Sequence, residues 1–481
     1  MTKRFLPLVV LLSALVGCTG ATQWRTRPPP RPEPASITER LPVVQEMEIA
    51  GGLNLLLAPR SHAPLVSVQI VLLTGHDDDP EDKAGLAALS SSALAEHARS
   101  LNLEGCAAPA FGKSDVPEIT VESDGVRIGA TVLPGDAEAV LARFAAAIET
   151  VSVEDEDLHA IKRSSVAAGS TRRGIIGGDA IAKIVLGRED SLSRPSSGCE
   201  ESRSRITTAD VERFFDEHLR PENMAIVVAG RIVPEDVAGM VQHHFGAWAR
   251  KYGGEPMEGL RVSAPAAVSL DSSSTAERSR GSAFLAALGI GSSRPRPDSS
   301  KLPVVRVSNR NSPRLVVALG SPAAPSDAAG EAALRMAEYA LGGALRWHLR
   351  EESRLSYRVS HQLVLHRHGG LLAASATMPH DAVPEATSAA RRAVVDASRW
   401  LERESGFDLI RNAALQALMD ELDTVHGLGD AVARTYQRGL PANHHIEVAR
   451  AMESAPPARV GEVLERLLDP AVARILLIGV R

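Results

Sequence analysis

The chain has 481 residues, a formal net charge of -6 and an aromatic content of only 3%. This mild negative charge and the scarcity of aromatic rings exclude a typical nucleic-acid surface, which needs a basic face and rings that stack on bases. The length allows two or more domains, each with a sizeable hydrophobic core.

The first residues of the chain have the three parts of an export signal. Lys3 and Arg4 supply positive charge, and the apolar run 5–16 is too short to cross a bilayer as a helix. The run leads into Leu-Val-Gly-Cys, which resembles a bacterial lipobox with Cys18 as the residue that receives acyl chains. An ordinary secretory signal is the alternative. We expect a lipid-anchored protein of the cell envelope, and Thr19, where aspartate would favour inner-membrane retention, favours the outer membrane, facing the periplasm.

A proline-rich segment, 19–40, follows this signal and includes three consecutive prolines at 28–30. Such a composition favours extended chain over packed structure, so we expect a tether between the lipid and the globular part. Besides Cys18, the chain contains only Cys106 and Cys199. In an exported protein these two either pair or remain separate thiols, and the sequence leaves both alternatives open.

The first half of the globular part opens with an apolar strand over 64–73. Gly75, an acidic turn and a helix from Lys83 onward follow this strand. The half closes with a helix capped near Thr207, a proline turn and an apolar strand over 224–230.

The second half repeats this order. An apolar strand over 313–320 leads through a small-residue loop into a helix over 330–350. A helix over 457–468, a proline turn and a strand over 473–480 close the chain. Both halves thus end in helix, proline turn, strand and glycine, which is the pattern that a duplicated domain leaves in a sequence.

Between the halves, a segment rich in serine, glycine, proline and arginine has the composition of a linker. We predict an α+β fold, with two homologous domains that each contain a mixed, mostly antiparallel sheet with helices packed on it. The predicted segments are a signal peptide at 1–18, a tether at 19–40, an N-terminal domain at 41–250, a linker at 251–302 and a C-terminal domain at 303–481.

The helix that follows Lys83 carries Ala-Leu-Ala-Glu-His at 93–97. Here the chain resembles the pitrilysin/insulinase family of zinc peptidases, whose helix reads H-x-x-E-H. The resemblance covers nearly the whole mature chain and implies two insulinase-like domains. In the family, both histidines of the motif and a distant glutamate bind zinc, and the motif glutamate activates the metal-bound water.

Two of these three zinc ligands are missing from the sequence. Ala93 stands in place of the first histidine, and a methyl group has no lone pair for a metal. No acidic residue lies between Asp157 and Asp179, where the family has its distant glutamate. We therefore expect neither metal nor cofactor. Glu96 and His97 would be vestigial, with Glu96 solvated and His97 packed or lining a cleft.

The second half keeps a different family signature. Arg350 and Tyr357 follow a Gly-Gly pair at 342–343 and match the arginine and tyrosine that, in active relatives, contact the substrate carbonyl and the developing oxyanion. Both side chains donate hydrogen bonds suited to that task. The alternative is a helix-end arginine and a packed strand tyrosine. Arg354 departs from the family, which usually has glycine there, and we expect Arg350 and Tyr357 to face the cleft between the halves.

The remaining histidines point less clearly to a function. His366 and His368 alternate on a predicted strand, which favours a polar solvent face over a metal pair. The adjacent pairs His243-His244 and His444-His445 diverge on any regular element, so we expect both pairs at the surface.

In bacteria, relatives often occur as pairs in which one subunit keeps the zinc half and the other keeps only the arginine and tyrosine. This chain has the second pattern, so the leading hypothesis is an inactive lipoprotein that binds peptide or unfolded protein and partners an active zinc peptidase of the same family. The alternatives are a structural scaffold without peptide binding and an active peptidase with relocated zinc ligands.

Overall fold

The computed structural model describes residues 37–101, 117–171, 178–187, 193–253, 302–307, 314–321, 325, 327–367 and 369–479. The chain divides into two compact units, Met1–Arg40 and Leu41–Arg481. Of the first unit only the 3-10 turn η1 (Ile37–Arg40) is described, so the predicted signal, Cys18 and most of the tether lie outside the described residues, as do Cys106 and most of the linker. Among the described residues, no helix has the length and apolar character needed to span a membrane.

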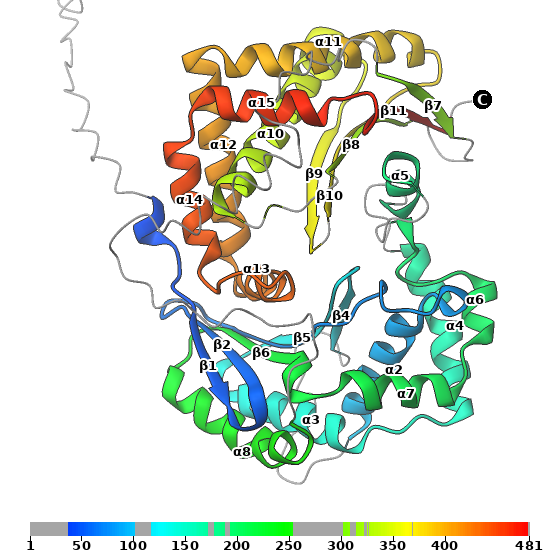
Figure 1. Cartoon of the computed structure of the whole chain (residues 1–481), viewed down its shortest axis with the longest axis vertical. Coiled ribbons are helices and arrows are strands. Elements are labelled where there is room, and N and C mark those ends of the chain that lie inside the picture. Colours follow the sequence, from blue (N-terminus) through cyan, green and yellow to red (C-terminus); the bar gives the residue numbers. More distant parts are fainter. Residues whose placement is uncertain are drawn as a thin grey trace, which may run out of the picture. The chain divides into compact units, whose positions relative to one another are not determined.

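The first half is built on a six-stranded sheet in the order β1-β2-β6-β3-β5-β4 (Figure 1). Every neighbouring pair is antiparallel except β2 and β6, which run parallel. The strands are β1 (Gln45–Ile49), β2 (Leu53–Pro59), β3 (Val66–Leu72), β4 (Glu118–Val121), β5 (Val126–Val132) and β6 (Met224–Gly230).

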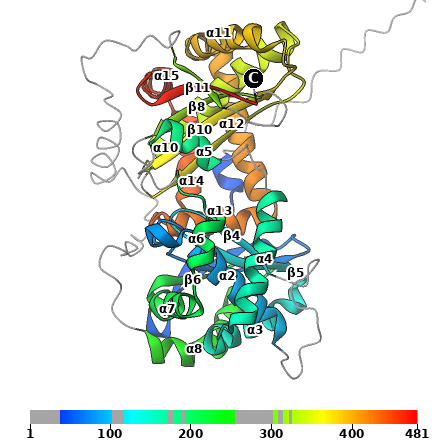
Figure 2. The same ribbon diagram turned by 90° about the vertical axis from the view of Figure 1, so that its right-hand side faces the viewer.

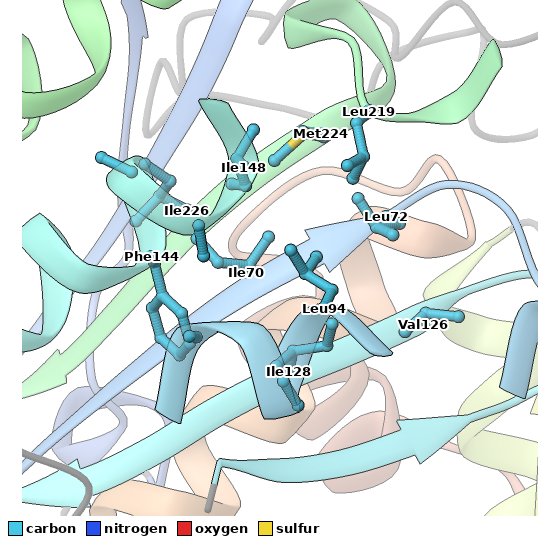
Figure 3. Close-up of a cluster of buried hydrophobic side chains, with 14 of the residues drawn as sticks. Ile70, Leu72, Leu94, Val126, Ile128, Phe144, Ile148, Leu219, Met224 and Ile226 are labelled. Carbon is cyan, nitrogen blue, oxygen red and sulfur yellow. The ribbon is translucent and has the colours of Figure 1, made fainter. Parts of the chain in front are cut away.

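Helices on this sheet enclose a large hydrophobic core. Ile70 and Ile226 of the sheet pack with Leu94 and Phe144 of the helices, as Figure 3 shows. Short 3-10 turns lie at Ala50–Gly52 (η2), Glu81–Lys83 (η3), Pro134–Asp136 (η4) and Pro221–Asn223 (η6). The helices of the half are α2 (Leu86–Ser100), α3 (Ala137–Thr150), α4 (Asp155–Thr171), α5 (Gly178–Val185), α6 (Glu200–Arg205), α7 (Thr208–His218) and α8 (Pro234–Tyr252).

The second half contains a five-stranded sheet in the order β7-β11-β8-β10-β9, in which only β7 and β11 are parallel. Its strands are β7 (Val304–Val307), β8 (Arg314–Ser321), β9 (Val359–His366), β10 (Gly369–Thr377) and β11 (Ala473–Ile478). Its helices are α10 (Ala328–Arg346), the π-helical turn η8 (Trp347–Glu352), α11 (Val383–Leu401), α12 (Glu404–Asp423), α13 (Val425–Gln437), α14 (His444–Ser454) and α15 (Pro457–Leu467).

The two sheets have equivalent topologies. In each, the closing strand of the half, β6 or β11, lies parallel to one neighbour and antiparallel to the next, and two antiparallel strands then lead to the edge. The edge strands β4 and β9 therefore occupy corresponding places. The predicted α+β class with two similar halves is confirmed, and the predicted cap at Thr207 is present, because its side chain accepts a hydrogen bond from the Asp210 amide.

Each half contributes a helix that covers the sheet of the other half. Helix α13 of the second half packs on β3 and β6, where Gly429 permits close approach because a Cβ there would lie 2.9 Å from Gln69 Nε2. In return, α5 of the first half places Ile181 and Val185 against Val316 and neighbouring residues of the second sheet (Figure 2). Each half thus helps to cover the sheet of the other, and the core at α5 contains residues of both halves.

Gln437, the last residue of α13, fixes this helix to the first sheet. Its side-chain amide donates to the carbonyl oxygens of Leu72 and Val126, at 3.3 Å each. Its oxygen accepts a hydrogen bond of 2.9 Å from Arg127 Nη1, and the whole side chain is buried. One side chain thus joins the second half to β3 and β5.

Replacing Gln437 with alanine is expected to destabilise the protein by about 1–3 kcal/mol, because buried polar groups of the first sheet lose their partner. The thermal unfolding midpoint of the variant measures this loss. Gln416→Ala on the exposed side of α12 is the matched control and should leave the midpoint nearly unchanged. Equal midpoints for Q437A and the wild type would show that α13 is held by other contacts.

Candidate functional site

Helix α2, which carries the altered zinc motif, is anchored at its N-terminus by a buried carboxylate. Asp79 accepts hydrogen bonds from the amides of Gly85 and Ala87, at 2.7 and 2.8 Å. Gly85 itself has a positive φ of 99°, a conformation that favours glycine. Burial raises the pKa of Asp79 to about 7, although the backbone hydrogen bonds oppose this rise. The start of α2 is therefore fixed by residues that precede the motif.

The three motif positions are all engaged within the first half. Ala93 is 4% exposed and belongs to the core of that half. Glu96 accepts hydrogen bonds from Arg99 on the same helix, and these lower the pKa of the carboxyl group. His97 Nε2 lies 2.9 Å from the hydroxyl of Thr150 on α3, and burial lowers the pKa of His97.

Zinc does not fit this arrangement. Position 93 has no donor atom, and the described residues contain no group of three histidine, cysteine, aspartate or glutamate side chains placed to hold a metal ion. The acid-free stretch that follows Asp157 is helical as far as Thr171, but its side chains from 165 onward lie outside the described structure. No catalytic step through a metal is therefore assigned to α2.

Arg350 and Tyr357 lie together at the surface of the second half. The Arg350 guanidinium carbon is 5.4 Å from the centre of the Tyr357 ring, and Tyr357 is 88% exposed. Between them, Arg354 has a φ of 54°, which accounts for glycine at the equivalent place in the family, because glycine adopts that conformation without strain. His348 lies in the π-helical turn η8, which also contains Arg350. The Nε2 atom of His348 is 2.9 Å from a carboxylate oxygen of Asp396 on α11, and this contact fixes the turn.

A cavity of about 550 Å³ lies between the halves, and neither Arg350 nor Tyr357 lines it. The edge strands β4 and β9 both contribute to its wall, β9 with the six consecutive residues 361–366. Since side chains alternate along a strand, six lining residues in a row mean that the edge of β9 itself faces the cavity. The remaining lining residues are His76, Val121, Glu122, Ser123, Ala182, Ser196, Arg335, Glu338, Tyr339, Leu371, Ala414, Ala417, Glu421, Arg434 and Arg438.

Two arginines of the cavity wall, Arg335 and Arg438, are held by a buried carboxylate behind it. Glu331, in the first turn of α10, is 2% exposed. Its oxygens lie 2.9 Å from Arg335 Nε, 2.8 Å from Arg438 Nη1 and 3.0 Å from His444 Nε2. Burial raises the pKa of Glu331, but these partners outweigh burial and hold it well below its usual range. The arginine charges are thus compensated within the protein.

Several histidines are buried, contrary to the sequence-based expectation. His366 was predicted on a solvent face but is 3% exposed and lines the cavity, whereas His368 lies outside the described residues. The prediction of a surface pair at His444 and His445 is also wrong, because both are buried, and His445 Nε2 lies 2.8 Å from the carbonyl oxygen of Pro42. Packing against distant segments, which local alternation does not reveal, explains both errors.

The sequence analysis also missed the residues that form the cavity wall. Glu338 and Tyr339 lie on α10 and His361 and Gln362 on β9, and none of them belongs to a family motif. The one available signal was the Gly-Gly pair at 342–343, because Gly342 lets the His361 ring lie against α10. The signal shows close packing but not a cavity.

The described part of the chain thus forms two similar α+β halves around a shared cavity, and α2 has no donor atom at position 93. Solved structures share this fold. The peptidase M16 inactive domain from Pseudomonas fluorescens matches with a TM-score of 0.68 and 14% identity, over 91% of this chain and 98% of that one. The first half of the periplasmic protease PqqL from Escherichia coli matches with a TM-score of 0.64 and 12% identity, over 90% of this chain and 91% of that one. Pitrilysin matches with a TM-score of 0.63 and 15% identity, and the match covers 91% of this chain but only 45% of the pitrilysin chain.

Residues 205–398 match the family model described as "Peptidase M16 inactive domain". A search of curated proteins found no match. The domain match and the M16 fold are consistent with a non-catalytic member of the pitrilysin family and support a catalytically inactive peptidase homologue. The resemblance predicted from the sequence motifs is thereby confirmed.

His76 links the cavity to the pH dependence of stability. It is 6% exposed, and burial, followed by the charges of His366 and Arg194, lowers its pKa from 6.5 to about 4, against the opposing effect of Asp78 and Glu122. As the pH falls from about 6.5 towards 4, the unfolded chain takes up a proton that the folded chain does not. Stability should therefore decrease over this range, by up to about 3 kcal/mol for this one group.

We expect His76→Gln to reduce the loss of thermal stability between pH 7 and pH 4.5, because the variant lacks this proton uptake. His243→Gln, at an exposed position of α8, is the control and should behave like the wild type. The comparison measures the unfolding midpoint of the three proteins at both pH values. The same pH dependence in H76Q and the wild type would rule out the role assigned to His76.

Proposed function

We propose that this protein is a non-catalytic subunit that binds extended peptide segments in the cavity between its halves and assists an active zinc peptidase of the same family. The observation that supports peptide binding is the open edge of β9 along the cavity. A strand at a sheet edge carries backbone groups that can pair with an extended peptide, and neighbouring side chains then select its sequence. The cavity is also lined by apolar residues of β9, among them Leu363 and Val364.

Peptide binding can be tested at β9. We expect the purified protein to bind a fluorescently labelled, unstructured peptide, with binding measured by fluorescence anisotropy. Val364→Asp should weaken this binding about tenfold, because it places a charge on an apolar part of the cavity wall. Val304→Asp, on β7 at the opposite edge of the same sheet, is the matched control. If the wild type binds no peptide, or both variants bind equally well, the scaffold alternative is favoured.

We further propose that the protein holds no stoichiometric zinc and cleaves no peptide alone. The support is the chemistry of α2, where Ala93 offers no ligand and Glu96 is bound by Arg99. Elemental analysis of the purified protein is expected to find far less than one zinc per chain, and peptide incubated with it should remain intact. One zinc per chain, or cleavage that a chelator abolishes, would instead support an active peptidase with relocated ligands.

Arg350 and Tyr357 are proposed to contact the partner or its substrate, since they form an exposed pair outside the cavity.

Attachment by lipid at Cys18, in the outer membrane facing the periplasm, would place the protein in the cell envelope. Cys18→Ser should move the protein from the membrane to the soluble fraction and abolish its labelling by fatty acid. Unchanged membrane association and labelling of this variant would refute the anchor.

A further inference from the structure

One carboxylate of the cavity wall differs from the others in its partners. Among the described residues, the cavity is lined by three carboxylates. Glu122 receives two hydrogen bonds from Arg127, at 2.8 and 2.9 Å, and Glu421 lies 3.2 Å from Arg335. Guanidinium groups carry a permanent positive charge, so these two carboxylates are compensated. Glu338 is the third.

Within the described structure, the ion-pair partner of Glu338 is a histidine. His361 Nδ1 of β9 lies 3.0 Å from Glu338 Oε1, and the two side chains are 13% and 12% exposed. Arg335 lies nearly one helical turn before Glu338, but it donates to Glu331 and Glu421. A histidine compensates a carboxylate only when it is protonated. Glu338 has no arginine within ion-pair distance among the described residues, although the Arg335 guanidinium acts on it from further away.

Aromatic rings lie beside this carboxylate. The His361 ring meets the Tyr339 ring edge to face, with centres 4.7 Å apart. Gly342 makes this packing possible, because a Cβ at that position would collide with His361 Cδ2. Tyr339 lines the same cavity and presents a π-system of the kind that attracts cations. The site thus combines a half-buried carboxylate with an aromatic side chain.

We propose that Glu338, Tyr339 and His361 form a subsite for a cationic side chain, lysine or arginine, of the peptide in the cavity. This inference rests on the proposed peptide binding and adds a preference to it. A cation entering the cavity donates a charge-assisted hydrogen bond to Glu338 in an environment with less water than the surface. The other two carboxylates of the wall, Glu122 and Glu421, do not compete for it, because each already pairs with arginine.

The test compares two labelled peptides that differ only in one central residue, lysine or glutamine. We expect the wild type to bind the lysine peptide about tenfold more tightly, a typical contribution of a hydrogen bond to a charged group. Glu338→Gln should abolish this preference while leaving the affinity for the glutamine peptide nearly unchanged. Glu385→Gln, an exposed residue of α11 outside the cavity, removes the same charge and should keep the preference.

A second measurement separates the subsite from peptide binding in general. Nα-acetyl-lysine amide should compete with the lysine peptide for the wild type but not for E338Q. Tyr339→Leu removes the aromatic ring but keeps the Glu338 carboxylate, so it should reduce the preference for the lysine peptide in part. This variant replaces E338Q as the test if E338Q does not fold. Equal binding of both peptides to the wild type would overturn the subsite alone, whereas binding of neither would overturn the proposed peptide binding as well. A preference that persists in E338Q would also exclude Glu338.

Discussion

The architecture depends on the need of each sheet for cover on both faces. Strands β3 and β6 are buried along their whole length, which a sheet with helices on one face only cannot achieve. The second cover of the first sheet is α13, from the other half of the chain, and the second sheet receives α5 in the same way. Because this exchange removes apolar surface of both halves from water, it fixes the walls of the cavity as well as the cores.

A buried charge network supports α13 in this position. Arg438 follows the helix and binds Glu331 of α10, which also holds His444 at the start of α14. Burying a carboxylate is costly unless charged and hydrogen-bonding partners offset the lost hydration, and Glu331 has three such partners. Since Arg438 and Arg335 also line the cavity, the interactions that hold α13 determine which charges a ligand would meet.

The sequence predicted the local elements better than their partners. The strand 224–230 was predicted to the residue, and the cap at Thr207 followed from its side-chain chemistry. The loss of the zinc ligand at Ala93 could also be read directly, because an alanine cannot bind metal in any fold. Burial of His366 and His444 could not, since it depends on segments far away in the chain. Likewise, the motif resemblance indicated Arg350 and Tyr357 and the expectation was that they face the cleft between the halves, but neither residue lines the cavity there.

The exchange of helices has a consequence for the order of folding. Gln437 reaches the carbonyl oxygen of Leu72 across 365 positions of the chain, so the first sheet gains its second cover only when nearly all of the protein has been synthesised. Until then, one apolar face of that sheet is open to water and to other chains, a state that favours aggregation. Contacts of such high sequence separation also slow folding, because a long loop must close before they form. The protein should therefore rely on chaperones more than two independent domains of the same size would.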